Sequence, residues 1–195
     1  MKNVGANSFR RYVAGASLFC ATIFLLTGCD KANNPEPADE NELITTVSLK
    51  FTEQGTTNAR TFTYRDVDGD GGQAPTKFDA ITLTAGKTYD LAITFQDESK
   101  TPADDITAEI NQKKDEHLVV YTPSPASLLT VTITDKDSRN YPVGLTSTAK
   151  AGAAGTGTLK VQLRHQPPVN GQPVKNGTVT PGSDDVNLDF TLTVN

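Results

Sequence analysis

Residues 186–194 read Val-Asn-Leu-Asp-Phe-Thr-Leu-Thr-Val, and this stretch decides the fold class. Apolar side chains occupy every second position from Val186 to Val194, and polar side chains fill the positions between them. Successive side chains of a β-strand point to opposite faces, so a period of two predicts a strand with one buried and one solvated face. A helix would space its apolar residues by three and four instead.

The same alternation recurs along the chain at residues 47–52, 89–95, 129–134 and 159–164, and weaker strand patterns lie at 60–65, 77–84, 118–121 and 141–147. About nine short strands with one wet face each predict two sheets packed face to face. The expected fold is therefore an all-β, Greek-key, immunoglobulin-like β-sandwich. A closed barrel of eight or nine strands is the alternative.

The segments between the predicted strands contain residues that are typical of turns and loops. Thr84-Ala85-Gly86-Lys87 predicts a tight turn that joins two strands as an antiparallel hairpin. The Ala- and Gly-rich segment 150–157 predicts a bend or a weak edge. Residues 166–182 contain four prolines and three glycines, which predicts a long loop.

One segment has a helical signal. Thr101 and Pro102 match the first positions of a helix, and Ile106 and Ile110 fall four residues apart on one face. We expect a short helix at about 102–115, with a run of turns as the alternative.

The N-terminus reads as an export signal. Residues 1–11 carry three basic side chains and no acid, and residues 12–26 are uncharged and mostly apolar. A membrane-spanning helix needs about 20 apolar residues, so this run is short for one. The last four residues, Leu26-Thr27-Gly28-Cys29, resemble a bacterial lipobox, which implies cleavage before Cys29 and lipid attachment to its thiol. An ordinary signal peptide that happens to contain a cysteine is the alternative.

These features divide the chain into a signal peptide (1–28), a lipidated Cys29 with a disordered acidic linker (29–42), and one domain (43–195). Residues 30–42 hold five acids, two prolines and no large apolar residue. Loss of the signal would leave 15 basic against 23 acidic residues. So acidic a chain is a poor nucleic-acid binder, and we expect a membrane contact through acyl chains.

An acidic loop is the sharpest local motif. Asp66, Asp68 and Asp70 stand two residues apart before glycines, which matches the opening of a calcium-binding loop. The acid expected at the twelfth position is replaced by Lys77. We name the three aspartates as a calcium candidate, and a simple acidic turn is the alternative.

His117 and His165 are the two histidines of the chain. His165 lies two residues after Leu163 and continues the alternation of the strand at 159–164, so its side chain should face inward. His117 follows the expected helix. Together they would suit haem or zinc. The alternative is an inward-facing rim histidine and a surface histidine that caps the helix C-terminus.

Three sequence blocks, Asp66–Gly72, Ala103–Ile110 leading into Asp115–His117, and Gly155–Pro167, together resemble a family of small Bacteroidetes lipoproteins. That family is often labelled "type 1 periplasmic binding fold superfamily protein". The label implies alternating βαβ units in two lobes, whereas one candidate helix and about 150 folded residues favour the all-β interpretation. The resemblance implies an outer-membrane location, periplasmic or surface-exposed, and no catalytic residues.

Metalloprotease, nucleotide-binding and serine-hydrolase motifs do not occur in the sequence. The acid pair Asp184–Asp185 is interpreted as an ordinary polar entry to the last strand. We therefore expect no enzyme and no obligatory cofactor. The predicted function is a lipid-anchored cell-envelope module that binds a protein or glycan, with loops 66–72 and 166–182 as its contact elements. A carrier of haem, metal or small lipid is the alternative.

Overall fold

The computed structural model describes residues 43–69 and 71–195. The predicted signal peptide, Cys29 and the acidic linker lie outside these ranges. The described residues form ten strands and one helix. In chain order they are β1 (Thr46–Glu53), β2 (Ala59–Arg65), β3 (Lys77–Phe78), β4 (Ile81–Leu83), β5 (Thr88–Gln96), α1 (Ile106–Gln112), β6 (His117–Ser124), β7 (Leu129–Ile133), β8 (Thr146–Ala151), β9 (Gly155–His165) and β10 (Ser183–Val194).

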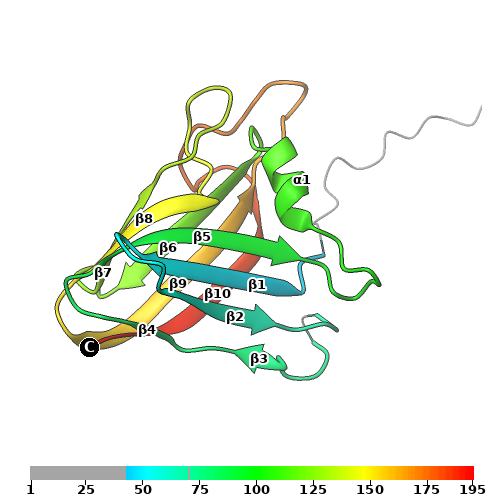
Figure 1. Ribbon diagram of the computed structural model, residues 1–195. Helices are drawn as coiled ribbons and strands as arrows, with labels where there is room; N and C mark the ends of the chain where they lie inside the picture. Colours follow the sequence, from blue (N-terminus) through cyan, green and yellow to red (C-terminus); the bar gives the residue numbers. More distant parts are fainter. Residues whose placement is uncertain (1–42, 70) are drawn as a thin grey trace, which may run out of the picture. The chain divides into compact units, whose positions relative to one another are not determined.

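The strands form two separate sheets rather than a barrel. One has the order β3-β2-β1-β5-β8-β7 and the other β4-β10-β9-β6 (Figure 1). Neighbours are antiparallel except β4 and β10, which are parallel. In the larger sheet β5 returns beside β1, so β3-β2-β1-β5 has the Greek-key order. The predicted all-β sandwich is confirmed.

The alternating positions form the core between the sheets. Phe51, Phe95 and Phe190 are completely enclosed and come from β1, β5 and β10. Phe51 makes edge-to-face contacts with Phe62 and Tyr89 at 5.9 and 6.0 Å. Since these residues all follow the period of two, the pattern identified the buried faces correctly.

Two strand predictions around the turns were wrong. Residues 77–84 are split into β3 and β4, which belong to different sheets. The turn at 84–87 therefore carries the chain from one sheet to the other, because β4 pairs with β10 while β5 pairs with β1 and β8. A tight turn shows that the chain reverses, but it does not show which partner each strand finds.

The expected strand at 141–147 and the bend at 150–157 were also misplaced, because the strands are β8 and β9 on either side of a short turn. Small residues are required here because other backbone lies close. A Cβ on Gly157 would lie 2.1 Å from the carbonyl oxygen of Ser124. The Ala- and Gly-rich composition suggested a weak strand. The glycines instead leave space for the neighbouring backbone to approach closely.

Helix α1 is confirmed but shorter than predicted. Asp105 is its N-cap, and its side chain accepts a hydrogen bond from the backbone N–H of Ala108. Asp104 instead pairs with Asp97 in a β-bridge, so the helix cannot start at Pro102. Ile106 and Ile110 are both buried, as their spacing predicted.

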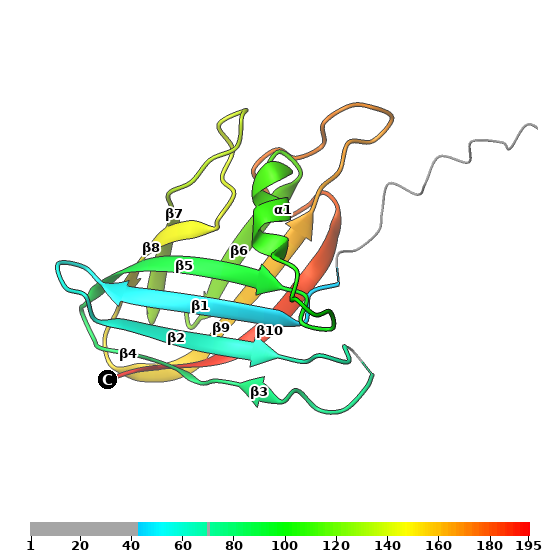
Figure 2. The ribbon, with the colours of Figure 1, turned by 45° about the vertical axis from the view of Figure 1, so that its right-hand side comes forward.

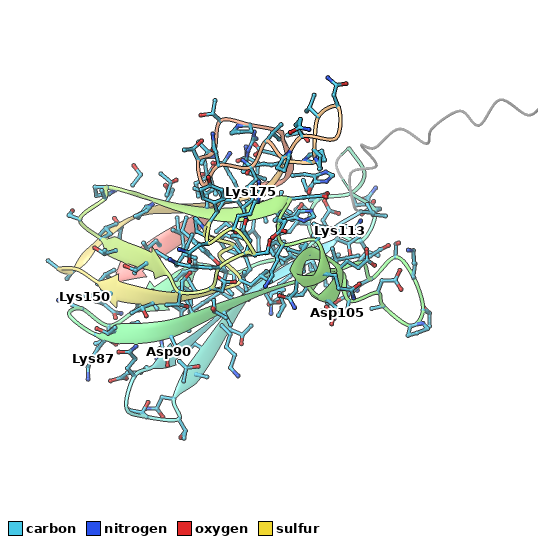
Figure 3. All side chains as sticks on the ribbon, turned by 90° about the horizontal axis from the view of Figure 1, so that it is seen from above. Lys87, Asp90, Asp105, Lys113, Lys150 and Lys175 are labelled. Atoms are coloured by element: carbon cyan, nitrogen blue, oxygen red, sulfur yellow. The ribbon has the colours of Figure 1, made fainter. Side chains whose placement is uncertain are left out.

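The segments that follow β7 and β9 project from the same end of the domain, beside α1 (Figures 1 and 2). Figure 3 shows Lys175 within the long loop 166–182, and Asp105 and Lys113 at the two ends of α1. The side chain of Lys175 is fully buried. The long loop is therefore attached to the domain at its middle as well as at its two ends.

Candidate metal centre

Three side chains from neighbouring strands meet beside the exit of α1. His117 is the first residue of β6 and His165 is the last residue of β9, and the two lie directly opposite each other in the antiparallel register. Their rings stack with centroids 4.8 Å apart and an interplanar angle of 6°. Asp185 joins them from the start of β10, which pairs with the other edge of β9.

A β-bulge directs Asp185 toward the histidines. The register of β10 with β9 runs from Asp184↔Arg164 to Val186↔Leu163, so Asp185 is an extra residue without a partner position. Asp184 bonds Arg164 at 2.6 Å on the outer face, whereas the side chain of Asp185 is fully enclosed. The bulge thus gives two adjacent aspartates opposite environments.

The hydrogen bond of His117 determines which ring nitrogen carries the proton. Its Nδ1 lies 3.1 Å from the backbone carbonyl oxygen of Lys113. A carbonyl can only accept, so Nδ1 carries the hydrogen and the neutral ring keeps its lone pair on Nε2. That Nε2 lies 3.9 Å from Oδ2 of Asp185. Metal-binding histidines are commonly oriented by such a bond from the second ring nitrogen.

Burial keeps His117 in the neutral form. Loss of hydration is the largest cause that lowers its pKa, to about 4, against the bond to Lys113, which raises it. Electrostatic interactions with His165, Lys113 and Lys175 lower the pKa of His117 further. A neutral imidazole is the form that coordinates a metal ion.

The three donors are close enough for one ion. One ligand atom from each of His117, His165 and Asp185 lies within 4.8 Å of the others. Two ligands of a tetrahedral zinc ion, each bound at about 2.0–2.2 Å, are separated by about 3.3 Å. The donor atoms are thus near the spacing that one ion needs, and binding requires the two stacked rings to turn so that their in-plane lone pairs converge on it. Imidazole and carboxylate donors together suit zinc and its neighbours better than calcium or magnesium.

Two buried ring nitrogens support this interpretation. Among the described residues, Nε2 of His117 and Nδ1 of His165 have no hydrogen-bond partner, although neither is reached by water. Buried polar atoms in folded proteins nearly always have a partner. A bound cation would provide one for His117, whose free lone pair points toward Asp185.

The surroundings of His117 are rigid because the carbonyls at the exit of α1 are all bonded. Each of the four backbone carbonyls at residues 113–116 accepts one hydrogen bond. The carbonyls of 113 and 114 accept from Nδ1 of His117 and from Nζ of Lys175, the latter at 2.8 Å. Those of 115 and 116 accept from Nη2 of Arg139 and from the backbone N–H of Gln166, both at 2.6 Å. Lys175 also forms a fully buried ion pair of 3.0 Å with Asp137. These contacts hold the first residue of β6 in a fixed position.

The predicted calcium residues are partly described. Asp70 lies outside the described residues, so the calcium prediction stays a prediction. Oδ2 of Asp66 accepts a hydrogen bond from Tyr64 at 3.2 Å, and Asp68 accepts one from the N–H of Gln73 at 2.7 Å. This N–H is the largest cause that lowers the pKa of Asp68, and a bond with the Asp66 carboxyl lowers it further. The structure thus brings Asp66 and Asp68 together.

The histidine predictions had a mixed outcome. His165 faces inward, as its parity predicted, and His117 bonds the carbonyl of Lys113, the C-cap residue of α1, as expected of a cap. His117 is buried, however, and not at the surface. Asp185 was missed because the residue pair 184–185 resembled an ordinary polar strand entry. The only hint in the sequence was the acidic pair directly before the alternation of β10. Recognising that Asp185 faces inward requires knowing how β10 pairs with β9.

Comparisons with protein families, with curated proteins and with solved structures gave no match. The resemblance to small Bacteroidetes lipoproteins therefore stays a prediction. Within residues 43–69 and 71–195, no helix has the length and apolar character needed to cross a membrane.

Proposed function

We propose that this chain is an exported cell-envelope protein, anchored by lipid at Cys29, whose domain binds a divalent transition-metal ion. The observation that carries the proposal is the enclosed donor set of His117, His165 and Asp185 beside the exit of α1. The signal-like N-terminus and the lipobox resemblance support the location at an outer membrane, on its periplasmic or surface side. Metal is thus favoured among the carrier ligands expected from the sequence.

The burial of the centre favours binding over catalysis. The side chains of His117 and Asp185 have no exposed surface, and His165 is 8% exposed. A catalytic metal needs an open coordination position that a substrate can reach. The three donor side chains have little or no exposed surface, so we assign a non-enzymatic role.

A metal titration tests the function. The domain is stripped of metal and titrated with Zn²⁺, and with Co²⁺ because its visible absorption reports coordination by nitrogen and oxygen. We expect one ion per chain and no comparable response to Ca²⁺ or Mg²⁺.

Matched variants locate the site. We expect His165→Asn and Asp185→Asn to weaken Zn²⁺ affinity by about 100-fold or more, because each removes a direct ligand. Asp189→Asn is the control for Asp185→Asn, because it makes the same chemical change on the same strand. The Asp189 side chain is half-exposed and paired with Lys160, so this variant should leave the Zn²⁺ affinity unchanged. Zn²⁺ binding that survives in both ligand variants contradicts the proposal.

The anchor has a separate test. Cys29→Ser should move the protein from the membrane fraction to the soluble fraction, because the acyl chains are its proposed membrane attachment. Ser17→Ala, within the predicted signal, is the control and should leave the fractionation unchanged. A Cys29→Ser protein that stays in the membrane fraction excludes lipid attachment at this thiol.

A protein or glycan partner is the second candidate function. Val169 and Val179 are 56% and 47% exposed on the long loop, which buried Lys175 holds in place. Exposed apolar residues on a fixed loop are typical of contact surfaces. A photo-crosslinking residue at position 169 should give a discrete adduct in intact cells, whereas one at Thr130 on β7 should not. Equal labelling at both positions argues against a partner at this loop.

A further inference from the structure

A hollow of about 310 Å³ lies between the start of β1, the end of β2 and the start of β10. Its lining includes Leu43, Val47, Tyr64, Asp66, Asp185 and Leu188. Among the described residues of the lining, Asp66 and Asp185 are the ionisable acids. The hollow therefore connects the acidic loop at Asp66 with Asp185 of the metal centre. The proposed function gives this acidic loop no role.

Asp66 is a buried acid, and one of its carboxyl oxygens accepts no hydrogen bond from the described residues. It is 5% exposed, and Tyr64 donates to its Oδ2. Its Oδ1 is buried and has no hydrogen-bond partner within the described part of the chain. A desolvated carboxylate oxygen without a partner is costly, and a cation is the group that would stabilise it best.

A second acid lies near the Asp66 side chain. The carboxyl of Asp68 lies close enough to Asp66 for the two to interact. Two neighbouring carboxyl groups can bind one divalent cation together. A cation is therefore favoured beside Asp66, and Asp185 lines the same hollow.

We propose that this hollow is the entry site of the metal ion, where Asp66 captures a partly hydrated divalent cation and passes it to Asp185 and the two histidines. This inference rests on the proposed function of the centre. The ion exchanges water for the Asp66 oxygen first and for the buried donors afterwards. Asp66 thus acts on the rate of loading and not on the final coordination.

Stopped-flow mixing of the metal-free protein with Co²⁺ tests the proposal. An entry site stabilises an intermediate on the path in both directions, so its loss slows uptake and release alike. We expect Asp66→Asn to slow both rates about tenfold, within the range of electrostatic effects on association, and to leave Kd within twofold. Asp189→Asn is the control for lost charge and should load at the wild-type rate.

A second variant avoids the buried position. Leu43 is 53% exposed at the rim of the hollow, so the fold should tolerate a polar side chain there. Leu43→Lys places a positive charge at the mouth and should slow uptake several-fold at low salt, with the effect lost at high salt. Leu43→Gln is its control and should load normally.

The outcomes separate this inference from the proposed function. A wild-type protein that binds no Co²⁺ or Zn²⁺ overturns both. Normal binding with wild-type uptake rates in Asp66→Asn and Leu43→Lys overturns the entry site alone. A Kd for Asp66→Asn that rises through faster release also overturns it, because Asp66 would then be a ligand of the bound ion.

Discussion

Two buried polar clusters lie beside the exit of α1, and they differ in how their atoms are satisfied. Asp137 accepts hydrogen bonds from the N–H groups of Arg139 and Tyr141 at 2.9 and 2.8 Å and faces the ammonium of Lys175 at 3.0 Å. Lys175 also donates to the carbonyl of Lys114. His117 and His165, in contrast, each keep a buried nitrogen without a hydrogen-bond partner among the described residues.

The difference separates a structural cluster from a functional one. The Asp137–Lys175 pair balances its charges within the protein, so it needs nothing from outside to be stable. In the histidine cluster, Nε2 of His117 and Nδ1 of His165 have no hydrogen-bond partner among the described residues, and a bound ion would provide one. Each cluster therefore responds differently to mutation, metal and acid.

The largest expected effect is the loss of the structural pair. Lys175→Met should lower the free energy of unfolding by about 3–5 kcal/mol, because it removes the nearest counter-charge of the buried Asp137 carboxylate and leaves it the more distant Arg139 at 3.8 Å. Denaturant unfolding of the metal-free domain measures this. The double variant Lys175→Met/Asp137→Leu should recover much of the loss. A change below about 1 kcal/mol in the single variant contradicts the buried-pair interpretation.

The next effect is stabilisation by metal. Zn²⁺ at 100 times its Kd should add about 2.7 kcal/mol to the free energy of unfolding, because the ion binds only the folded state. For a domain of this size that raises Tm by about 5–10 °C. Scanning calorimetry with and without Zn²⁺ measures the shift. Asp185→Asn should abolish the shift, and an unchanged shift in this variant would assign the ion to another site.

Acid should weaken the structural cluster by a smaller amount. Burial raises the pKa of Asp137, but Lys175 and the two N–H groups lower it more, so its pKa is below the usual value. A carboxyl with a lowered folded-state pKa contributes stability above its unfolded pKa of about 3.8 and loses it as pH falls through the folded value. Unfolding measured from pH 5 to pH 2 should show this decline. Asp137→Asn should show a shallower decline, and equal slopes would exclude Asp137 as the cause.

The smallest effect is expected outside both clusters. Lys160 and Asp189 form an exposed ion pair of 2.8 Å on the outer face of the smaller sheet. Asp189→Asn should change the free energy of unfolding by less than about 1 kcal/mol and leave Zn²⁺ binding intact, because solvent screens such pairs. Urea unfolding checks the first expectation and Zn²⁺ titration the second. A larger change would place this pair among the structural contacts.

Much of the fold was predictable from local pattern. The period of two identified β1, β5, β7, β9 and β10 and their buried faces, and the inward direction of His165 followed from the same parity. Helix α1 was predicted from its apolar spacing, but the prediction extended it by a few residues at each end. These features were accessible because each depends on residues a few positions apart.

The candidate site was less accessible. His117 looked like a surface cap because the sequence does not show that β6 pairs with β9 and places it opposite His165. Asp185 looked like a polar strand entry because the bulge that turns it inward exists only relative to β9. The partners of each residue come from strands tens of residues away.

Alternation of apolar and polar residues is enough to establish strands, buried faces and an all-β domain, since side-chain direction in a strand is a local property. Pairing between distant strands is not local, because many registers bury the same apolar faces almost equally well. The sharing of β3 and β4 between two sheets, the bulge at Asp185 and the meeting of two histidines with one carboxylate were therefore decided by tertiary packing alone.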